Sequence, residues 1–263
     1  MAAGMRGGLG IASWLFLAGA ILLMFFVVLG GVSHSTPLNK VHFLQADTSK
    51  ITGARPISRW NYFYVCGADN RDCGDAVPAL PFGYAWIGNT AGVPSALLGK
   101  HGKGTTSQYY YYIWRFGWVF YLIALVFAVL SLFTGLVSFH KIGSGISSLL
   151  CFIATGFMTL AASLMTVEFV KARDVFNKNN MSASLGKYAF GFTWAALVCL
   201  CLATLGFFGG CCVGRSSSSK TQHTTNDGVA DRQTSFFRRN RSQRQRGSFV
   251  DNESQRRVVK EEY

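Results

Sequence analysis

The stretch that decides the fold is 116-FGWVFYLIALVFAVLSLFTGLVSFH-140, an apolar run that contains no Asp, Glu, Lys or Arg. Three more charge-free runs lie within residues 7–39, 142–167 and 188–214. The hydrocarbon core of a bilayer is about 30 Å thick and needs roughly 20 apolar helical residues, so each run can hold one membrane span. Four such runs indicate a protein that crosses the membrane four times.

Buried helices of a soluble protein are the alternative explanation for these runs. Soluble helices show polar faces at 3.6-residue spacing, whereas Phe, Leu, Val and Ala occupy all sides here. Half of the 263 residues are hydrophobic and only 14% are charged, and the mean hydropathy is positive (+0.26). We therefore predict membrane spans at residues 9–32, 116–139, 146–167 and 188–210.

The predicted spans leave a short N-terminus (1–8), a first loop (33–115), a turn (140–145), a second loop (168–187) and a tail (211–263). The first loop is too long to be a simple connection, and its segment 60-WNYFYV-65 is rich in strand-forming residues. The predicted fold class is therefore a mainly α membrane protein. It is a four-helix transmembrane bundle with a small extracellular antiparallel β-sheet in the first loop.

Aromatic residues gather within residues 109–118, where the second predicted span enters the membrane. Such rings are favoured at the level of the lipid headgroups, where one end is wet and the other apolar. We interpret this cluster as an interfacial belt rather than a ligand site.

Cys66 and Cys73 lie in the first loop with six residues between them. In an oxidising compartment a disulfide at this spacing would constrain the loop by about 2–3 kcal/mol through lost chain entropy. Zinc binding would need two further soft ligands, and the nearby histidines (His34, His42 and His101) are irregularly spaced. We therefore predict a Cys66–Cys73 disulfide.

Basic residues do not decide which side of the membrane the loops face. Four lie beside the spans on the side of the termini (Arg6, Lys141, Arg215 and Lys220), and four lie in the second loop (Lys171, Arg173, Lys178 and Lys187). The positive-inside rule is therefore tied. Because a disulfide forms outside the cytosol, we expect the first loop to be external and both termini to be cytosolic.

Three processing motifs accompany the spans. The first apolar run is longer than the 7–15 residues usual in a cleaved signal peptide, so we expect it to be retained. Cys211 and Cys212 follow the last predicted span and precede Arg215; they are candidates for S-palmitoylation or ordinary small residues at a helix end. Asn180-Met181-Ser182 is a formal glycosylation sequon, but we expect it to lie close to the membrane, which disfavours its glycosylation.

The tail is a separate compositional region. Residues 215–263 hold 11 Lys/Arg and six Asp/Glu, a net charge of +5, and their low hydrophobicity predicts disorder. Near an anionic inner leaflet, each basic side chain gains about 1 kcal/mol from its attraction to the lipid. For a chain tethered to the membrane we therefore favour lipid binding over nucleic-acid binding. A tail that only keeps the protein soluble is the other alternative. The candidate lipid-binding residues are Arg232, Phe236, Phe237, Arg238, Arg239, Arg241, Arg244 and Arg246.

Two serines in this basic stretch suit basophilic kinases. Ser235 follows Arg232 by three residues, and Ser242 follows Arg239 by three. Phosphates at these positions would cancel positive charge and weaken contact with lipid. Our hypothesis is an electrostatic switch, and serine-to-aspartate changes that leave liposome binding unaltered would refute it.

The chain lacks the signatures of an enzyme. It has no nucleotide-binding loop, HExxH motif or nucleophile elbow, so we predict no catalytic, cofactor or metal site. No charged residue lies inside a predicted span, which disfavours a channel or transporter. Gly206 and Gly210 form a GxxxG pair that serves helix packing within the chain or between copies.

Trp60, Cys66, Cys73 and the following 78-PALPF-82 segment, together with four spans and a basic tail, resemble the fungal SUR/PalI family. The resemblance covers about residues 9–212. It implies a claudin-like fold in which Trp60 packs the first loop against the bundle and Cys66 and Cys73 form the family's cystine. Pro78, Pro81 and Phe82 belong to the same motif.

The resemblance also implies a function. The family includes tetraspan proteins of the static plasma-membrane furrows that eisosomes organise, so we expect a non-enzymatic organiser of such a microdomain in the plasma membrane. The expected partners are anionic inner-leaflet lipids, an eisosome-type coat, other membrane proteins or a second copy, and no nucleic acid. A PalI-like accessory role in ambient-pH signalling is the alternative.

Overall fold

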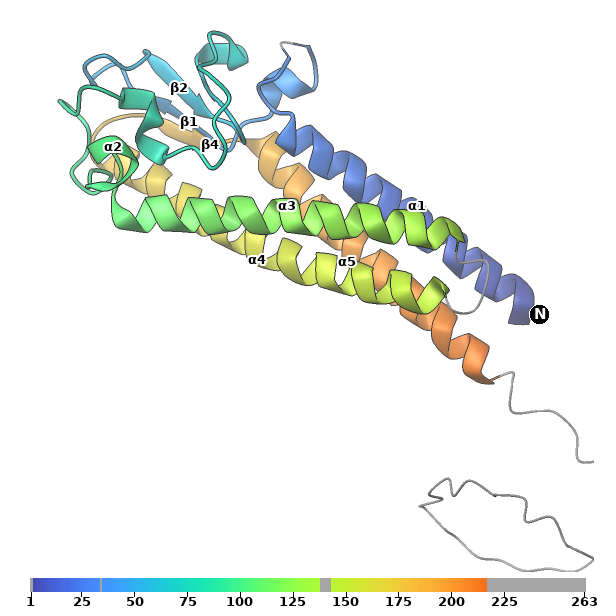
Figure 1. Cartoon of the computed structure of the whole chain (residues 1–263). Helices are drawn as coiled ribbons and strands as arrows, with labels where there is room; N and C mark the ends of the chain where they lie inside the picture. The colour runs from blue at the N-terminus through green and yellow to red at the C-terminus, as the bar shows by residue number, and fades with distance from the viewer. Residues whose placement is uncertain (1, 34, 138–142, 217–263) are drawn as a thin grey trace, which may run out of the picture. The chain divides into compact units, whose positions relative to one another are not determined.

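The computed structural model describes residues 2–33, 35–137 and 143–216, and Figure 1 shows their arrangement. Four long helices are α1 (Ala2–Val28), α3 (Gln108–Val137), α4 (Gly143–Lys178) and α5 (Lys187–Ser216). The strands are β1 (Leu44–Asp47), β2 (Ile57–Trp60), β3 (Val65–Cys66) and β4 (Ala183–Leu185), and α2 (His101–Gly104) is a single turn. The short 3₁₀ helices η1, η2 and η3 cover Leu38–Lys40, Ala68–Asn70 and Phe82–Trp86.

Each long helix is long and apolar enough to cross a membrane. Each overlaps one predicted span, and a small antiparallel sheet lies at one end of the helices (Figure 1). The predicted fold class is confirmed. The basic tail segment and its serines lie outside the described residues.

The buried faces of the helices combine many small residues with some large ones such as Met24 and Tyr121, whereas other large apolar side chains are exposed. Helix α3 packs along α4, α1 packs along α5, and α4 also contacts α5. The exposed fractions of Leu205, Ile11 and Phe133 are 68%, 62% and 59%. Small side chains let membrane helices approach closely while lipid covers the large apolar ones, so this distribution fits a bundle surrounded by lipid. The fully buried alanines of the long helices are Ala20, Ala124, Ala128, Ala154, Ala161, Ala162, Ala172, Ala189, Ala196 and Ala203.

Hydrogen bonds also join the helices. Ser131 Oγ on α3 donates to the carbonyl oxygen of Ser147 on α4 at 2.9 Å. The hydroxyls of Thr155 on α4 and Thr204 on α5 lie 3.0 Å apart. Such bonds contribute about 0.6 kcal/mol each on average in membrane proteins, so they fix the register of the helices more than they stabilise the bundle.

Gly206 lies against Ser13 where α5 packs along α1. A Cβ atom at this position would overlap Ser13 Oγ and would lie 3.2 Å from Ser13 Cβ. Ser13 is itself buried, and its hydroxyl donates to the carbonyl oxygen of Leu9 at 2.7 Å. Of the two uses of this glycine, the structure therefore has it packing helices within one chain.

Gly206→Leu is expected to destabilise the bundle by about 1–3 kcal/mol, because overpacking displaces side chains or backbone. Gly191→Leu on the same helix is the matched control, since a Cβ there meets nothing within 4 Å. Thermal unfolding of the detergent-purified protein measures both. Equal melting temperatures for the two variants would contradict the packing assigned to Gly206.

The sheet has the order β3-β2-β1-β4, with all neighbours antiparallel. Strand β1 lies between β2 and β4, and its Leu44 pairs with Trp60 on one side and with Leu185 on the other. The prediction placed the sheet in the first loop alone; the structure adds β4 from the second loop. The predicted strand over residues 60–65 is instead two strand ends joined by a turn, in which Asn61 N donates to Tyr64 O at 2.8 Å.

Helices α3 and α4 extend far into the predicted first and second loops. Helix α4 continues from Val167 to Lys178, so most of the predicted second loop (168–187) is helix and strand. Helix α3 begins at Gln108, inside the predicted first loop. The spans were predicted from hydropathy, which marks only the part of a helix that lipid can surround. Helix α4 continues beyond that part because no Pro or Gly within residues 168–178 ends it.

Candidate functional site

Trp60 joins the sheet to the helices. It is 2% exposed at the end of β2, and its ring stacks on Phe82 with centroids 4.8 Å apart and planes 8° apart. Its Nε1 donates to the carbonyl oxygen of Phe82 at 2.9 Å. The ring of Phe176 on α4 lies 5.8 Å from that of Trp60. One side chain of strand β2 therefore contacts both the η3 segment and helix α4.

Phe82 extends this contact to α3 and α4. Its ring lies 5.6 Å from Tyr110 on α3 and 6.2 Å from Phe169 on α4. We call Trp60, Phe82, Trp86, Phe169 and Phe176 the aromatic clamp. All five side chains are nearly or fully buried. The clamp therefore fastens residues 29–107, which we expect to be external and call the external segment, to the bundle chiefly by apolar burial.

The other two residues of the predicted motif, Pro78 and Pro81, precede Phe82 in the chain. Pro81 is half-buried, and a Cβ atom at Gly102 would lie 2.6 Å from its Cβ. Gly102 has φ of +59°, a conformation that glycine adopts readily. Pro78 is exposed.

Tyr62 is a second contact point, which the sequence analysis did not single out. It is fully buried, and its hydroxyl donates to the carbonyl oxygen of Trp118 on α3 at 2.7 Å. Its ring lies 6.2, 5.6 and 5.4 Å from those of Trp114, Trp118 and Tyr121. The spacing of these three aromatics along α3 places them on one helix face. This spacing is the feature of the sequence that could have predicted the contact.

The interpretation of residues 109–118 as an interfacial belt needs correction. Tyr109, Tyr112 and Phe116 are 38%, 43% and 53% exposed, as such a belt requires, whereas Tyr110 and Trp114 are 5% and 3% exposed. The buried pair packs against the clamp and Tyr62, because one face of α3 meets the external segment.

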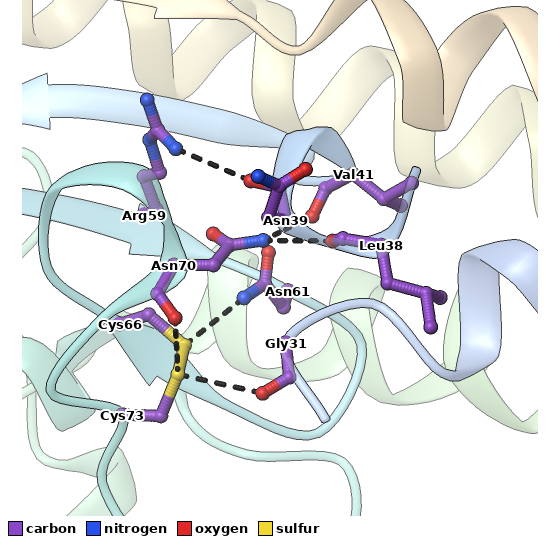
Figure 2. Close-up of a disulfide and its surroundings, with 9 residues drawn as sticks. All are labelled: Gly31, Leu38, Asn39, Val41, Arg59, Asn61, Cys66, Asn70 and Cys73. Atoms are coloured by element: carbon purple, nitrogen blue, oxygen red, sulfur yellow. Dashed lines mark hydrogen bonds between the residues drawn. A yellow bond between two sulfur atoms is a disulfide. The ribbon is translucent and has the colours of Figure 1, made fainter. Parts of the chain in front are cut away.

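The predicted disulfide between Cys66 and Cys73 is confirmed (Figure 2). Asn61 Nδ2 donates to Cys66 Sγ at 3.2 Å. Cys73 Sγ lies 3.5 Å from the carbonyl oxygen of Gly31, a contact without a proton because the sulfur is oxidised. Gly31 has φ of +87°, and a Cβ there would lie 2.5 Å from Asn61 Nδ2. The cystine therefore rests directly on the chain that leaves α1.

Asn70 fixes the loop that the cystine closes. Its side-chain Nδ2 donates to the carbonyl oxygens of Leu38 and Val41 at 3.1 and 2.9 Å (Figure 2). Asn70 is fully buried and has φ of +54°, which asparagine tolerates better than most residues. The closed loop is thus bonded to the segment that follows α1.

Arg59 bonds across the outward face of the sheet. Its Nε donates to Gln45 Oε1 at 2.7 Å, and its guanidinium lies 3.2 Å from Asp69 Oδ1. Because the Asp69 side chain is 75% exposed, this ion pair contributes little to stability. Its use is to position the η2 segment beside the sheet.

His42 has a pKa lowered to about 4 by burial and then by the nearby positive charge of Arg59. The unfolded chain binds this proton near the ordinary pKa of 6.5, whereas the folded chain does so only near 4. The free energy of unfolding is therefore expected to fall as the pH drops from about 6.5 to 4, by up to about 1.4 kcal/mol per pH unit. Thermal unfolding across this range measures the slope, and a His42→Gln variant with the same slope would contradict its assignment to His42.

Glu168 is a buried residue that the sequence analysis placed in the external loop. It is 0% exposed on α4, and neither carboxylate oxygen has a hydrogen-bond partner among the described residues. An unpaired buried charge is costly, so the uncharged carboxyl is the form that this site accommodates. Buried Met165 and Ala172 lie three and four residues away, and continuing the helical pattern past Val167 would have identified this position.

The remaining candidate residues are only partly covered. Cys211 and Cys212 have helical backbone in the last turns of α5, and their side chains lie outside the description. The lipid-binding candidates from Arg232 to Arg246 and the two serines, Ser235 and Ser242, lie wholly outside it. Among the described residues, no group of three or more His, Cys, Asp or Glu side chains could hold a metal ion.

Comparison with known proteins places this arrangement in a family context. The sequence pattern of the SUR7/PalI family matches residues 9–225. The chain is 36% identical to the SUR7 family protein FMP45 of Saccharomyces cerevisiae over 70% of its own length and 60% of that protein. It is 36% identical to protein SUR7 of Candida albicans over 74% of its length and 71% of that protein. It is 31% identical to a plasma membrane protein of S. cerevisiae, YNL194C, over 70% of its length and 62% of that protein.

Proposed function

Because the chain belongs to the SUR7/PalI family, we propose that it organises a plasma-membrane microdomain, the eisosome-associated furrow of fungal cells, without acting as an enzyme. The observation that carries the proposal is this membership, joined to the way the chain uses its aromatic residues. The aromatic clamp and Tyr62 fill the junction between sheet and helices with side chains. This supports a structural role for the external segment.

The external segment is the proposed contact with neighbouring molecules. The outward side chains of its sheet are polar: Gln45, Asp47 and Ser184 lie on the face away from the buried Leu44 and Ala46. The clamp and the cystine hold this face in a fixed position on the bundle. A fixed polar surface binds partners without the entropy cost of ordering a loop.

The tail is the proposed contact on the cytosolic side. Its arginines between Arg232 and Arg246 would bind anionic lipid or an eisosome-type coat, and the interleaved phenylalanines would enter the interface. S-palmitoylation of Cys211 and Cys212 would add a second membrane attachment. Phosphorylation of Ser235 and Ser242 would weaken the contact.

Live-cell imaging of the full chain, tagged after Tyr263 and recorded beside a marker of the furrow coat, tests this function. The expected result is immobile patches that coincide with the marker and recover slowly after bleaching. A variant in which the six arginines from Arg232 to Arg246 are changed to glutamine is expected to recover faster. A uniform rim signal of the unaltered chain that recovers fast after bleaching would refute the proposal. A growth defect confined to alkaline medium in cells that lack the chain would then favour an accessory role in pH signalling.

A further inference from the structure

The turn between α4 and β4 carries a sequon whose surroundings suit a carbohydrate. We propose that Asn180, in Asn180-Met181-Ser182, is N-glycosylated on the external side of the membrane. Asn180 is exposed, as is Ser182, whereas Met181 between them is 5% exposed. The turn thus presents the two residues that define the sequon and buries the one that does not.

The side chain of Asn180 has no structural task in this turn. Its amide makes no hydrogen bond within the described part of the chain. The turn is held instead by Asn177, whose Oδ1 accepts from Ala183 N at 2.9 Å, and by Met181 N, which donates to Phe176 O at 3.0 Å. Outside the turn, the carbonyl oxygen of Asn180 accepts a hydrogen bond from Lys50 Nζ at 2.8 Å. A glycan on Nδ2 therefore breaks no hydrogen bond to the described part of the chain.

The extension of α4 lifts this turn away from the lipid. The charge-free run ends at Val167, and the helix continues to Lys178 before the turn begins. At 1.5 Å per residue these added turns raise Asn180 by about 16 Å along the helix. The expectation that the sequon lies close to the membrane assumed that residues 168–178 form a loop. Because they form a helix, closeness to the membrane no longer hinders glycosylation.

The disulfide indicates which side the turn faces. Strand β4, which starts three residues after Asn180, pairs with β1, and β1 pairs with β2. Strand β2 in turn pairs with β3, which carries Cys66 of the cystine. Because the disulfide forms in the oxidising secretory compartment, Asn180 matures on the same side as the machinery that transfers glycans to sequons.

The reaction is a substitution at a sugar carbon. The side-chain nitrogen of Asn180 attacks the anomeric carbon of a lipid-linked oligosaccharyl diphosphate. A nitrogen–carbon bond forms, the carbon–oxygen bond to the diphosphate breaks, and the lipid diphosphate leaves with the electron pair. The displaced amide proton passes to a base of the transferase, and nothing is oxidised or reduced.

A glycan at this turn would also shield the sheet. In the order β3-β2-β1-β4, strand β4 is an edge that pairs on one side only. An open edge is a template for pairing with another chain. A bulky hydrophilic group three residues before β4 would obstruct such pairing.

The chain contains its own controls for this proposal. Two further sequons, Asn240-Arg241-Ser242 and Asn252-Glu253-Ser254, lie in the tail, which we place in the cytosol. Only Asn180 is therefore expected to carry a glycan. Ser182→Ala destroys its sequon, whereas Ser182→Thr preserves it at the same exposed position.

The experiment is electrophoresis of the full chain from its fungal host, before and after treatment with peptide-N-glycosidase. The unaltered chain, Ser182→Thr and an Asn240→Gln/Asn252→Gln double variant are each expected to lose the mass of one glycan. Ser182→Ala and Asn180→Gln are expected to lose none. The proposal is overturned if the enzyme does not change the mass of the unaltered chain, or if the mass change persists in Ser182→Ala. A mass change that disappears in the Asn240→Gln/Asn252→Gln variant would overturn it too, and would also reverse the assigned topology.

Discussion

Trp60→Ala is expected to lower the free energy of unfolding of the external segment by about 3–5 kcal/mol, the usual cost of deleting a buried Trp side chain. The ring is 2% exposed and stacks on Phe82 at 4.8 Å, so its loss leaves a cavity between the sheet and α4. The hydrogen bond from Nε1 to the carbonyl of Phe82 is lost as well. A loss of this size is a large fraction of the stability of an ordinary domain.

Limited proteolysis and thermal unfolding of the detergent-purified protein measure this effect. Trp60→Phe retains a ring for stacking but loses the hydrogen bond, so an intermediate value is expected. Ile87→Ala is the matched control in the same external segment, because Ile87 is 45% exposed and surface changes usually stay within about 0.5 kcal/mol. If Trp60→Ala were no more protease-sensitive than Ile87→Ala, the clamp would not be what holds the segment.

The second large effect is expected from the double variant Cys66→Ser/Cys73→Ser. Opening the short ring between these residues restores chain entropy to the unfolded state, which lowers stability by about 2–3 kcal/mol. The cystine also rests on the chain leaving α1, where Cys73 Sγ lies 3.5 Å from the carbonyl oxygen of Gly31. Loosening is therefore expected around η2 and at the end of α1, while the four helices stay inserted.

Hydrogen exchange at residues 66–73 and 29–33 measures this loosening. Reduced unaltered protein is expected to exchange like the double variant. Cys201→Ser is the control, because Cys201 is an exposed free thiol on α5. Unchanged exchange in both the reduced protein and the double variant would contradict a stabilising role for the disulfide.

The parts of the fold that were predictable have signals that are local in the sequence. A charge-free run of 25 residues around Leu125 specifies a span by length and composition alone. Cys66 and Cys73 are close neighbours in the chain, so their pairing needs no knowledge of the remaining fold. The family motif likewise identified Trp60 and Phe82, although their contact joins residues 22 positions apart.

The parts that were missed depend on contacts between distant segments. Strand β4 has three residues, Ala183–Leu185, and becomes a strand only because α4 and α5 bring it beside β1. Tyr62 and Glu168 are buried because α3 and α4 continue beyond the lipid-sized segment and meet the external segment. Hydropathy defines the part of a helix in lipid and says nothing about its continuation in water.

The external contacts, the lipid-binding tail and the glycan at Asn180 all depend on the sidedness of the chain. This sidedness is tested most directly by labelling intact cells with a membrane-impermeant maleimide. Two single cysteines, Ile87→Cys and Gln255→Cys, are introduced separately into a chain in which Cys211 and Cys212 are serine. That parent chain without an added cysteine gives the background.

Ile87→Cys is expected to react in intact cells, whereas Gln255→Cys is expected to react only after the membrane is permeabilised. Labelling of Gln255→Cys in intact cells, with Ile87→Cys protected until permeabilisation, would contradict the assigned sidedness.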